Sequence, residues 1–377
     1  MASERTIVKQ ESLDLLRSLI AIPSFSKEEA GTAACLLDFF EKKGIRAYRQ
    51  GNNIYALSEP FDAKAPTLLL NSHHDTVKPN PQYTRDPFLP ALEDGRLYGL
   101  GSNDAGASLV SLIAAFCNGY DKISQQGWNM VLAATAEEEI SGSGGIEALL
   151  QDEEFNRQTK GCFRPGQLHS LTTAVVGEPT LLQMAVAERG LMVLDVMSVG
   201  RAGHAAREEG ENAIYNALND LNWFREYRFK KVSPLLGENK MSVTVIHTPN
   251  KAHNQVPTEC HFVVDTRINE CYSFEEVLAE IRQHCTSLIT PRSTRLRSTQ
   301  IALDHPLVKA GMGLGLSYYG SPTTSDKALI PFASLKIGPG DSARSHSADE
   351  FVYTAEIEKG IDLYIDLIST FMASNPV

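Results

Sequence analysis

The first half of the chain alternates between two kinds of apolar pattern. Apolar residues recur at helical spacing over residues 12–20 and 32–40, which predicts two amphipathic helices. Shorter stretches that are apolar throughout predict buried strands at 53–58, 67–71, 130–135 and 173–176, and a longer one predicts a helix at 105–120. Buried strands that alternate with helices are typical of an α/β domain, with a mostly parallel central sheet flanked by helices.

The pattern changes after about residue 182. Residues 191–199, 241–247 and 260–268 read as strands, the first with the alternation of a half-exposed strand. An amphipathic helix is expected at 212–227, and Ser273 with Glu276 forms a capping box before a second helix. With a last strand at 296–303, the order β-α-β-β-α-β predicts a ferredoxin-like α+β domain whose sheet has one solvent face.

Composition narrows the possible partners and the compartment. The net charge of −11 and the isoelectric point near 5.4 argue against nucleic acid or an anionic membrane as a partner. No apolar stretch approaches the roughly 20 residues of a membrane helix, and the first residues lack the pattern of a signal peptide. Six cysteines without a CxxC pair indicate reduced thiols in a cytoplasmic protein rather than a thiolate zinc site.

Residues that commonly ligate metals follow the predicted strands at their carboxyl ends. In an open α/β sheet, these ends meet along one edge, so the side chains are expected to form one site. Two histidines with several carboxylates suggest a two-metal site. The candidates, in chain order, are His73, Asp75, Asp104, Glu138, Glu139, Glu178 and His346.

Taken singly, each candidate also fits a plainer role. His73 resembles an ordinary buried histidine, and Asp104 resembles a cap at a helix N-terminus. Glu178 fits a surface turn, and His346 fits a Gly/Pro-rich loop. The conjunction favours a metal site, because every candidate follows a predicted strand or starts a helix.

The acidic run at residues 137–139 is the most specific segment. Three consecutive acids at the end of an apolar strand repel one another unless cations neutralise them, although a solvated acidic turn is the plain alternative. One acid can bind a metal while its neighbour acts as a general base. The candidates end at Glu178 and resume at His346. This gap predicts a discontinuous catalytic domain (1–181 and 291–377) interrupted by an inserted domain at 182–290.

These segments together resemble the di-zinc amidohydrolase and exopeptidase family of acetylornithine deacetylase, succinyl-diaminopimelate desuccinylase and carboxypeptidase G2-type enzymes. The resemblance runs over nearly the whole chain. It implies two Zn²⁺ ions, with Co²⁺ or Mn²⁺ as alternatives. His73 and Glu178 would bind the first ion, Glu139 and His346 the second, and Asp104 would bridge them. Asp75 would orient His73, and Glu138 would be the general base.

The resemblance extends to the insert, which would act as a lid and a dimerisation domain. His204 in the segment GlyArgAlaGlyHisAla would reach the active site of a neighbouring subunit in a homodimer. Asn254 in AsnGlnValPro and Arg267 in ValAspThrArg would hold the substrate carboxylate. Thr324, in ThrThrSerAspLys, would lie near the substrate.

The expected substrate is a small N-acyl amino acid, with N-acetylornithine of arginine biosynthesis as the first candidate. Glu188, Arg189 and Gly190 stand where the desuccinylase branch has ArgArgGly, which weakens the case for succinyl-diaminopimelate. AspAlaGlyAla at 104–107 replaces the family's AspMetLysGly without touching a ligand. An N-acylcitrulline, succinyl-diaminopimelate and a dipeptide stay open as substrates. A non-catalytic metal-binding protein is the alternative outside the enzymes.

Overall fold

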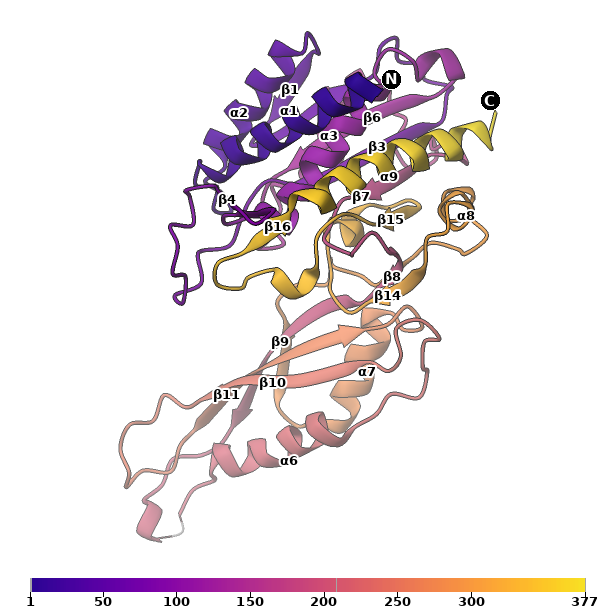
Figure 1. Ribbon diagram of the computed structural model, residues 1–377. Coiled ribbons are helices and arrows are strands. Elements are labelled where there is room, and N and C mark those ends of the chain that lie inside the picture. The colour runs from indigo at the N-terminus through magenta and orange to yellow at the C-terminus, as the bar shows by residue number, and fades with distance from the viewer. Residues whose placement is uncertain (1, 208, 377) are drawn as a thin grey trace. The chain divides into compact units, whose positions relative to one another are not determined.

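A computed structural model describes residues 2–207 and 209–376, and their contacts divide them into two compact units. The large unit comprises Met1–Val186, Ile301–Tyr319 and Ser325–Val377. The small unit comprises Ala187–Gln300 and Gly320–Thr324 (Figure 1). Its long segment begins at Ala187 and ends at Gln300, whereas the sequence predicted an insert at 182–290.

The large unit is built on a nine-stranded sheet with a parallel centre. Four parallel strands lie side by side in the order β6 (Asn129–Thr135), β3 (Thr67–His73), β7 (Thr173–Val176) and β15 (Ser334–Lys336). The other strands extend this centre at both edges: β1 (Ala47–Gln50), β2 (Asn53–Leu57), β8 (Met184–Glu188), β13 (Thr299–Gln300) and β14 (Tyr318–Ser321). Because β3, β6 and β7 are buried along their whole length, both faces of the sheet must be covered.

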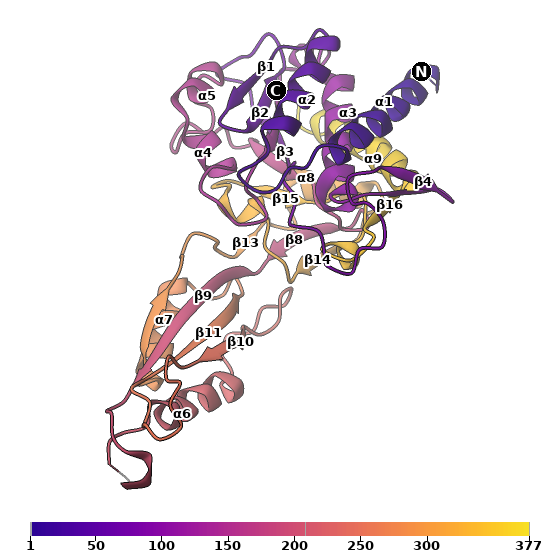
Figure 2. The ribbon, with the colours of Figure 1, turned by 90° about the vertical axis from the view of Figure 1, so that its left-hand side faces the viewer.

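Helices cover the two faces of this sheet (Figure 2). Helix α3 (Ala107–Gly119) packs on β3 and β6, and α1 (Ala2–Ile20) and α9 (Thr354–Ala373) pack on α3. Helix α2 (Ala30–Lys42) joins this layer through an edge-to-face contact between Phe40 and Phe116. The short helices α4 (Ile146–Gln151) and α5 (Glu153–Gln158) cover the opposite face, and α8 (Pro306–Gly313) packs against α9. This arrangement confirms the predicted mostly parallel α/β domain.

A second, three-stranded sheet in the large unit joins distant parts of the chain. Strand β16 (Phe351–Tyr353) pairs with β5 (Arg96–Tyr98), which pairs with β4 (Ala91–Glu93). The predicted start of α3 differs from the structure, because residues Ser102–Gly106 form an irregular turn and the helix begins at Ala107.

The small unit has the topology expected of a ferredoxin-like domain. Its sheet order is β10 (Lys240–His247), β11 (Glu259–Ile268), β9 (Gly190–Val199) and β12 (Leu288–Pro291), antiparallel throughout. Helices α6 (Ala213–Glu226) and α7 (Phe274–His284) cover one face of this sheet, and the capping box of Ser273 and Glu276 is present.

The predicted last strand of the small unit was wrong. Residues 288–291 pair with β9, whereas Thr299–Gln300 joins β8 in the large sheet. The apolar residues at 296–303 do not mark a strand of the small sheet, because Pro291 already ends the segment that pairs with β9. None of the helices in the described ranges is long and apolar enough to cross a membrane.

Candidate metal centre

His73 ends β3 with its ring buried and one nitrogen left for a ligand. Its Nδ1–H donates to the backbone oxygen of Asp75 at 3.0 Å, and Asp75 Oδ1 lies 3.4 Å from the same nitrogen. A carbonyl oxygen only accepts, so this bond fixes the tautomer and turns the lone pair of Nε2 toward the site. Nε2 is buried and has no hydrogen-bond partner among the residues that the structure describes. A histidine arranged in this way is suited to metal ligation.

The neighbouring His74 faces away from this site, as the alternation of side chains along an extended segment requires. Its Nδ1 lies 2.8 Å from Thr32 Oγ1, and its Nε2 lies 3.0 Å from the backbone oxygen of Asn52. Burial lowers the pKa of His74, so its ring is neutral and serves as a structural link between β3 and α2.

Three carboxylates face Nε2 of His73. The distances from this nitrogen are 3.4 Å to Asp104 Oδ1, 3.8 Å to Glu178 Oε1 and 4.0 Å to Glu138 Oε2. These donor atoms form two groups that share His73, and within each group all the atoms lie within 4.8 Å of one another. The first group is His73, Glu138 and Glu178, and the second is His73, Asp104 and Glu139. The strand ends of β3, β6 and β7 therefore bring their acids to a single place.

His346 approaches the same carboxylates from another side. Its Nε2 lies 2.9 Å from Glu139 Oε2 and 3.6 Å from Asp104 Oδ2. The two oxygens of Asp104 thus face two different imidazoles, His73 through Oδ1 and His346 through Oδ2. A carboxylate placed between two histidines in this way can bridge two metal ions.

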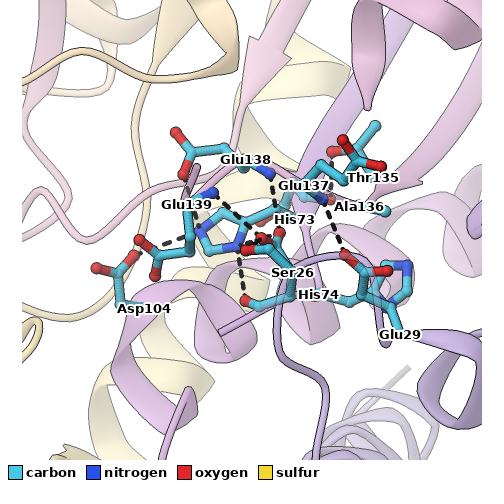
Figure 3. A network of polar contacts seen from close by, with 12 residues as sticks. Ser26, Glu29, His73, His74, Asp104, Thr135, Ala136, Glu137, Glu138 and Glu139 are labelled. Atoms are coloured by element: carbon cyan, nitrogen blue, oxygen red, sulfur yellow. Dashed lines mark hydrogen bonds and ion pairs between the residues drawn. The ribbon is translucent and has the colours of Figure 1, made fainter. Parts of the chain in front are cut away.

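The acidic turn after β6 is held in place by two buried carboxylates. Asp75 accepts the backbone N–H groups of Glu138 and Glu139, each at 3.1 Å. Glu29, at the start of α2, accepts the backbone N–H of Glu137 at 3.2 Å (Figure 3). The hydroxyl of Ser26 donates to Asp75 at 2.7 Å. These bonds fix the directions in which the three consecutive acids leave the strand.

The crowding of acids changes their protonation. Burial, together with the carboxylates of Glu178 and Asp326, raises the pKa of Glu138 well above its ordinary value. Burial also raises the pKa of Glu139 and brings the pKa of Asp326 to about 6. The hydrogen bond to Glu139 raises the pKa of His346 to about 9. Without metal ions, this cluster therefore holds extra protons at neutral pH.

The donor set fits divalent metal ions. Two imidazole nitrogens and several carboxylate oxygens suit Zn²⁺, Mn²⁺ or Co²⁺, and a bound cation would replace the protons that the crowded acids hold. The buried Nε2 of His73, which faces three carboxylates at 3.4 to 4.0 Å without forming a hydrogen bond within the described residues, is the clearest sign of a place for a cation. The residues that would hold metal ions here are His73, Asp104, Glu139, Glu178 and His346.

The four candidates in the small unit fall into two separate pairs. His204 and Asn254 lie on adjacent loops, because His204 pairs with Gln255 and the backbone N–H of Ala205 donates to Asn254. The His204 loop follows β9 at Val199, and the Asn254 loop precedes β11 at Glu259, which pairs with Val199. Both side chains are exposed, beside a hollow between these loops.

The second pair lies at the other end of the same sheet. Arg267 pairs with Leu191 in the register and forms a two-point ion pair with Asp265, at 2.8 and 3.0 Å. Thr324 donates its hydroxyl to the backbone oxygen of Arg189 at 2.9 Å. The ten residues of β9 separate the two ends by roughly 30 Å. Within one small unit, Asn254 and Arg267 are therefore not brought together.

Sequence reasoning missed several residues that build the centre. Glu29, Asp326 and Glu350 are buried acids close to the ligand-type residues. Asp326 lies in the ThrThrSerAspLys segment, where Thr324 had been favoured, and accepts a hydrogen bond from Thr135 at 2.7 Å. The contacts that tie Glu29 and Glu350 to the centre leave no signal in the sequence, because they are made to backbone N–H groups far away along the chain.

A family model and several relatives match this chain over most of its length. The model of peptidase family M20/M25/M40 matches residues 69–370. A succinyl-diaminopimelate desuccinylase of Wolbachia pipientis subsp. Culex pipiens is 23% identical, over 97% of this chain and 94% of its own. An acetylornithine deacetylase of Proteus mirabilis is 26% identical, over 95% and 96%. A putative [LysW]-lysine/[LysW]-ornithine hydrolase of Pyrobaculum aerophilum is 30% identical, over 92% and 93%.

Solved structures share the fold over almost the whole chain. An M20 family metallo-carboxypeptidase from Sulfolobus solfataricus superposes with a TM-score of 0.73 at 17% identity, covering 96% of this chain and 99% of its own. A dinuclear metal-binding peptidase of the M20 family from Bacillus subtilis gives 0.70 at 12% identity, over 98% and 99%. At these identities the likeness concerns the fold.

Proposed function

The chain belongs to peptidase family M20/M25/M40, and on that premise we propose that it hydrolyses the amide bond of an N-acyl amino acid with two bound Zn²⁺ ions. N-acetylornithine is the first candidate substrate, and the M20 membership makes the chain a metallopeptidase-type hydrolase. The observation that carries the two-metal proposal is Asp104, whose two oxygens face the imidazoles of His73 and His346.

We propose that Glu138 moves the proton in this reaction. When bound, the metal ions would polarise the amide carbonyl and make the attacking water more acidic. The carboxylate of Glu138 would accept a proton from that water and deliver it to the leaving nitrogen as the C–N bond breaks. The products are the free carboxylic acid and the amino acid with its α-amine restored. Asp75 supports this role by holding the backbone N–H of Glu138.

Glu138 also has the position of a possible ligand, since its oxygen lies in one donor group with His73 and Glu178. We favour the base role because Glu139, held by the same Asp75, already contacts His346 and provides the carboxylate for the second ion. The two roles differ in what a substitution does to metal content, so they are separable by experiment.

The substrate proposal rests on the relatives and on one buried residue. Both an acetylornithine deacetylase and succinyl-diaminopimelate desuccinylases are similar to this chain over nearly its full length. Glu188, where the desuccinylase pattern has a basic residue, is fully buried beside Arg189. An acid there removes a positive charge that could attract a second substrate carboxylate, which favours N-acetylornithine. Succinyl-diaminopimelate is the second candidate, supported by the relatives named for it.

We also propose that the protein acts as a homodimer and that the small unit is its lid and dimerisation domain. Strand β10 is the edge of the small sheet and is exposed along most of its length, with Val245 and Ile246 exposed by 49% and 53%. An apolar, unpaired edge strand favours pairing with another chain. Because His204 and Arg267 lie at opposite ends of β9, they fit one small substrate more easily if His204 comes from the second copy.

In such a dimer, His204 would donate a hydrogen bond to the oxyanion that develops during attack. Arg267 would bind the substrate carboxylate through its guanidinium.

The six cysteines are unpaired, which supports the proposed cytoplasmic setting.

The experiment that tests the proposal measures amine release by the Zn²⁺-loaded protein, with a chelator-treated control. The substrates are N-acetylornithine, N-acetylcitrulline, N-succinylcitrulline, succinyl-diaminopimelate and a set of dipeptides. Ornithine release that the chelator abolishes is expected. A strong preference for succinyl-diaminopimelate or for dipeptides would support the proposed hydrolase activity but overturn the proposed substrate. Two bound metals without any hydrolysis would overturn the proposed activity.

A further inference from the structure

We propose that Glu350 is a positioning residue for the metal centre: its buried carboxylate holds the backbone of the turn that carries Asp104, and it thereby sets the affinity for the bound metal ions. The proposal rests on the metal-dependent function proposed above. Glu350 immediately precedes β16 and is 2% exposed.

Glu350 accepts hydrogen bonds from several backbone N–H groups in and just before the turn that carries Asp104. Its Oε1 accepts the backbone N–H groups of Asn103 at 2.8 Å and of Asp104 at 3.0 Å, and its Oε2 accepts that of Gly101 at 3.0 Å. Its backbone oxygen accepts the N–H of Gly99 at 3.0 Å. Four backbone donors between Gly99 and Asp104, two of them inside the turn, therefore bond to one residue.

This acceptor replaces the hydrogen bonds that a helix would supply. The turn Ser102–Gly106 departs from helical backbone angles at Asp104 and Ala105. The N–H groups of Asn103 and Asp104 bond to the Glu350 carboxylate instead of to a backbone carbonyl of a preceding helical turn. An unsatisfied buried N–H is unfavourable, and a carboxylate that accepts several of them fixes their direction. The side chain of Asp104 leaves this fixed backbone toward His73 and His346.

A second set of bonds ties the His346 loop to the same turn. Nδ2 of Asn103 donates to the backbone oxygen of Asp341, and its Oδ1 accepts the N–H of Asp341, both at 3.0 Å. Its Nδ2 also lies 3.4 Å from the hydroxyl oxygen of Ser345, the residue before His346. The turn that Glu350 holds is therefore also the anchor of the loop that presents His346. Displacing it would move two ligand-type residues at once.

The neighbouring Asp349 provides a matched control. It also accepts backbone N–H groups, those of Thr84 at 2.9 Å and Arg85 at 3.0 Å. The loop that it holds carries none of the proposed ligands. Substituting Asp349 therefore removes a neighbouring carboxyl group and loosens the loop at Thr84 and Arg85 without removing an acceptor from the Asp104 turn.

The experiment compares wild type, Glu350→Gln, Glu350→Ala and Asp349→Asn. The Zn²⁺ affinity of each metal-free protein is measured by competition with a chromophoric chelator, and its melting temperature is measured with and without Zn²⁺. We expect Glu350→Ala to bind Zn²⁺ about 10- to 100-fold more weakly, as is usual when the supports of metal ligands are removed. Glu350→Gln keeps one oxygen for Asn103 and Asp104, so its loss is expected to be smaller. Asp349→Asn should bind like wild type.

The outcomes separate this inference from the function on which it rests. A purely structural role would lower the melting temperature of the metal-free protein but leave Zn²⁺ affinity and the Zn²⁺-induced rise in melting temperature unchanged, which would overturn the proposal. Equal losses in Glu350→Gln and Asp349→Asn would do the same. If wild type itself binds no Zn²⁺, the proposed metal-dependent function fails instead. Should Glu350→Ala not fold, Glu350→Gln alone decides between these outcomes.

Discussion

Asp104 and His346 lie close together although they are far apart in the sequence: Oδ2 of the acid lies 3.6 Å from Nε2 of the histidine. The other oxygen of Asp104 lies 3.4 Å from Nε2 of His73. Asp104 therefore joins two ligand groups, one built on β3 and β7 and one completed by the loop before β16.

The two neighbouring acids Glu137 and Glu138 are expected to respond differently to loss of charge. Glu138→Gln should lower kcat by a factor of about 10² to 10⁴, the usual contribution of a general base, while two metal ions stay bound. Glu137→Gln is the control, since its carboxylate turns to the backbone N–H of Gly144 instead. Metal analysis and steady-state kinetics measure both effects. Loss of a metal ion in Glu138→Gln would show that Glu138 is a metal ligand and would contradict its role as the base.

Metal binding is expected to release a proton from His346. Glu139 raises the pKa of this imidazole to about 9 in the metal-free protein, so the ring is protonated at neutral pH. A protonated imidazole cannot ligate, hence Zn²⁺ affinity should rise with pH and level off above about pH 9. Calorimetry in buffers with different heats of ionisation counts the released protons. His346→Asn should release fewer protons, and an affinity independent of pH would contradict the prediction.

Arg267 is expected to affect substrate binding more than turnover. Arg267→Lys keeps the charge but loses the two-point geometry, and KM should rise about 10- to 100-fold, corresponding to the roughly 1.5–3 kcal/mol of a charged hydrogen bond. Asp265→Asn is the companion variant, because the Arg267 guanidinium donates to both carboxylate oxygens of Asp265 in this structure. It should leave KM unchanged or lower it. An unchanged KM in Arg267→Lys would show that Arg267 does not bind the substrate.

Mixing two inactive variants tests whether His204 serves the partner subunit. Glu138→Ala disables the base, and His204→Ala should lower kcat by about 10² to 10³, as the loss of an oxyanion donor does. If His204 acts across subunits, a mixed dimer contains one site with both residues intact. Activity should then return on mixing under conditions that exchange subunits. Mixtures no more active than the sum of their parts would place His204 in its own subunit's site.

Much of the centre could be predicted because its main residues follow buried strands. The acids and histidine at the ends of β3, β6 and β7 occupy positions that the apolar pattern alone identifies, and parallel strands bring such ends together. The pattern could also place Asp104 before a helix. It could not show the irregular turn at Ser102–Gly106, because that turn depends on an acceptor near the other end of the chain.

Two of the residues that sequence reasoning missed, Glu29 and Glu350, are tied to the centre through backbone groups. Glu29 and Glu350 satisfy N–H groups of distant turns, and backbone groups leave no trace in the spacing of side chains. The last strand of the small unit was misplaced for a related reason. Residues 288–291 show no strong apolar alternation, and their pairing with β9 depends on where α7 delivers the chain.

The most direct test of the two-metal centre is anomalous diffraction at the zinc absorption edge from crystals grown with Zn²⁺. Two peaks about 3.5–4 Å apart are expected, one on each side of Asp104. The first should lie beside His73 and Glu178, and the second beside Glu139 and His346. A single peak, or two peaks that do not share Asp104, would contradict the proposed centre.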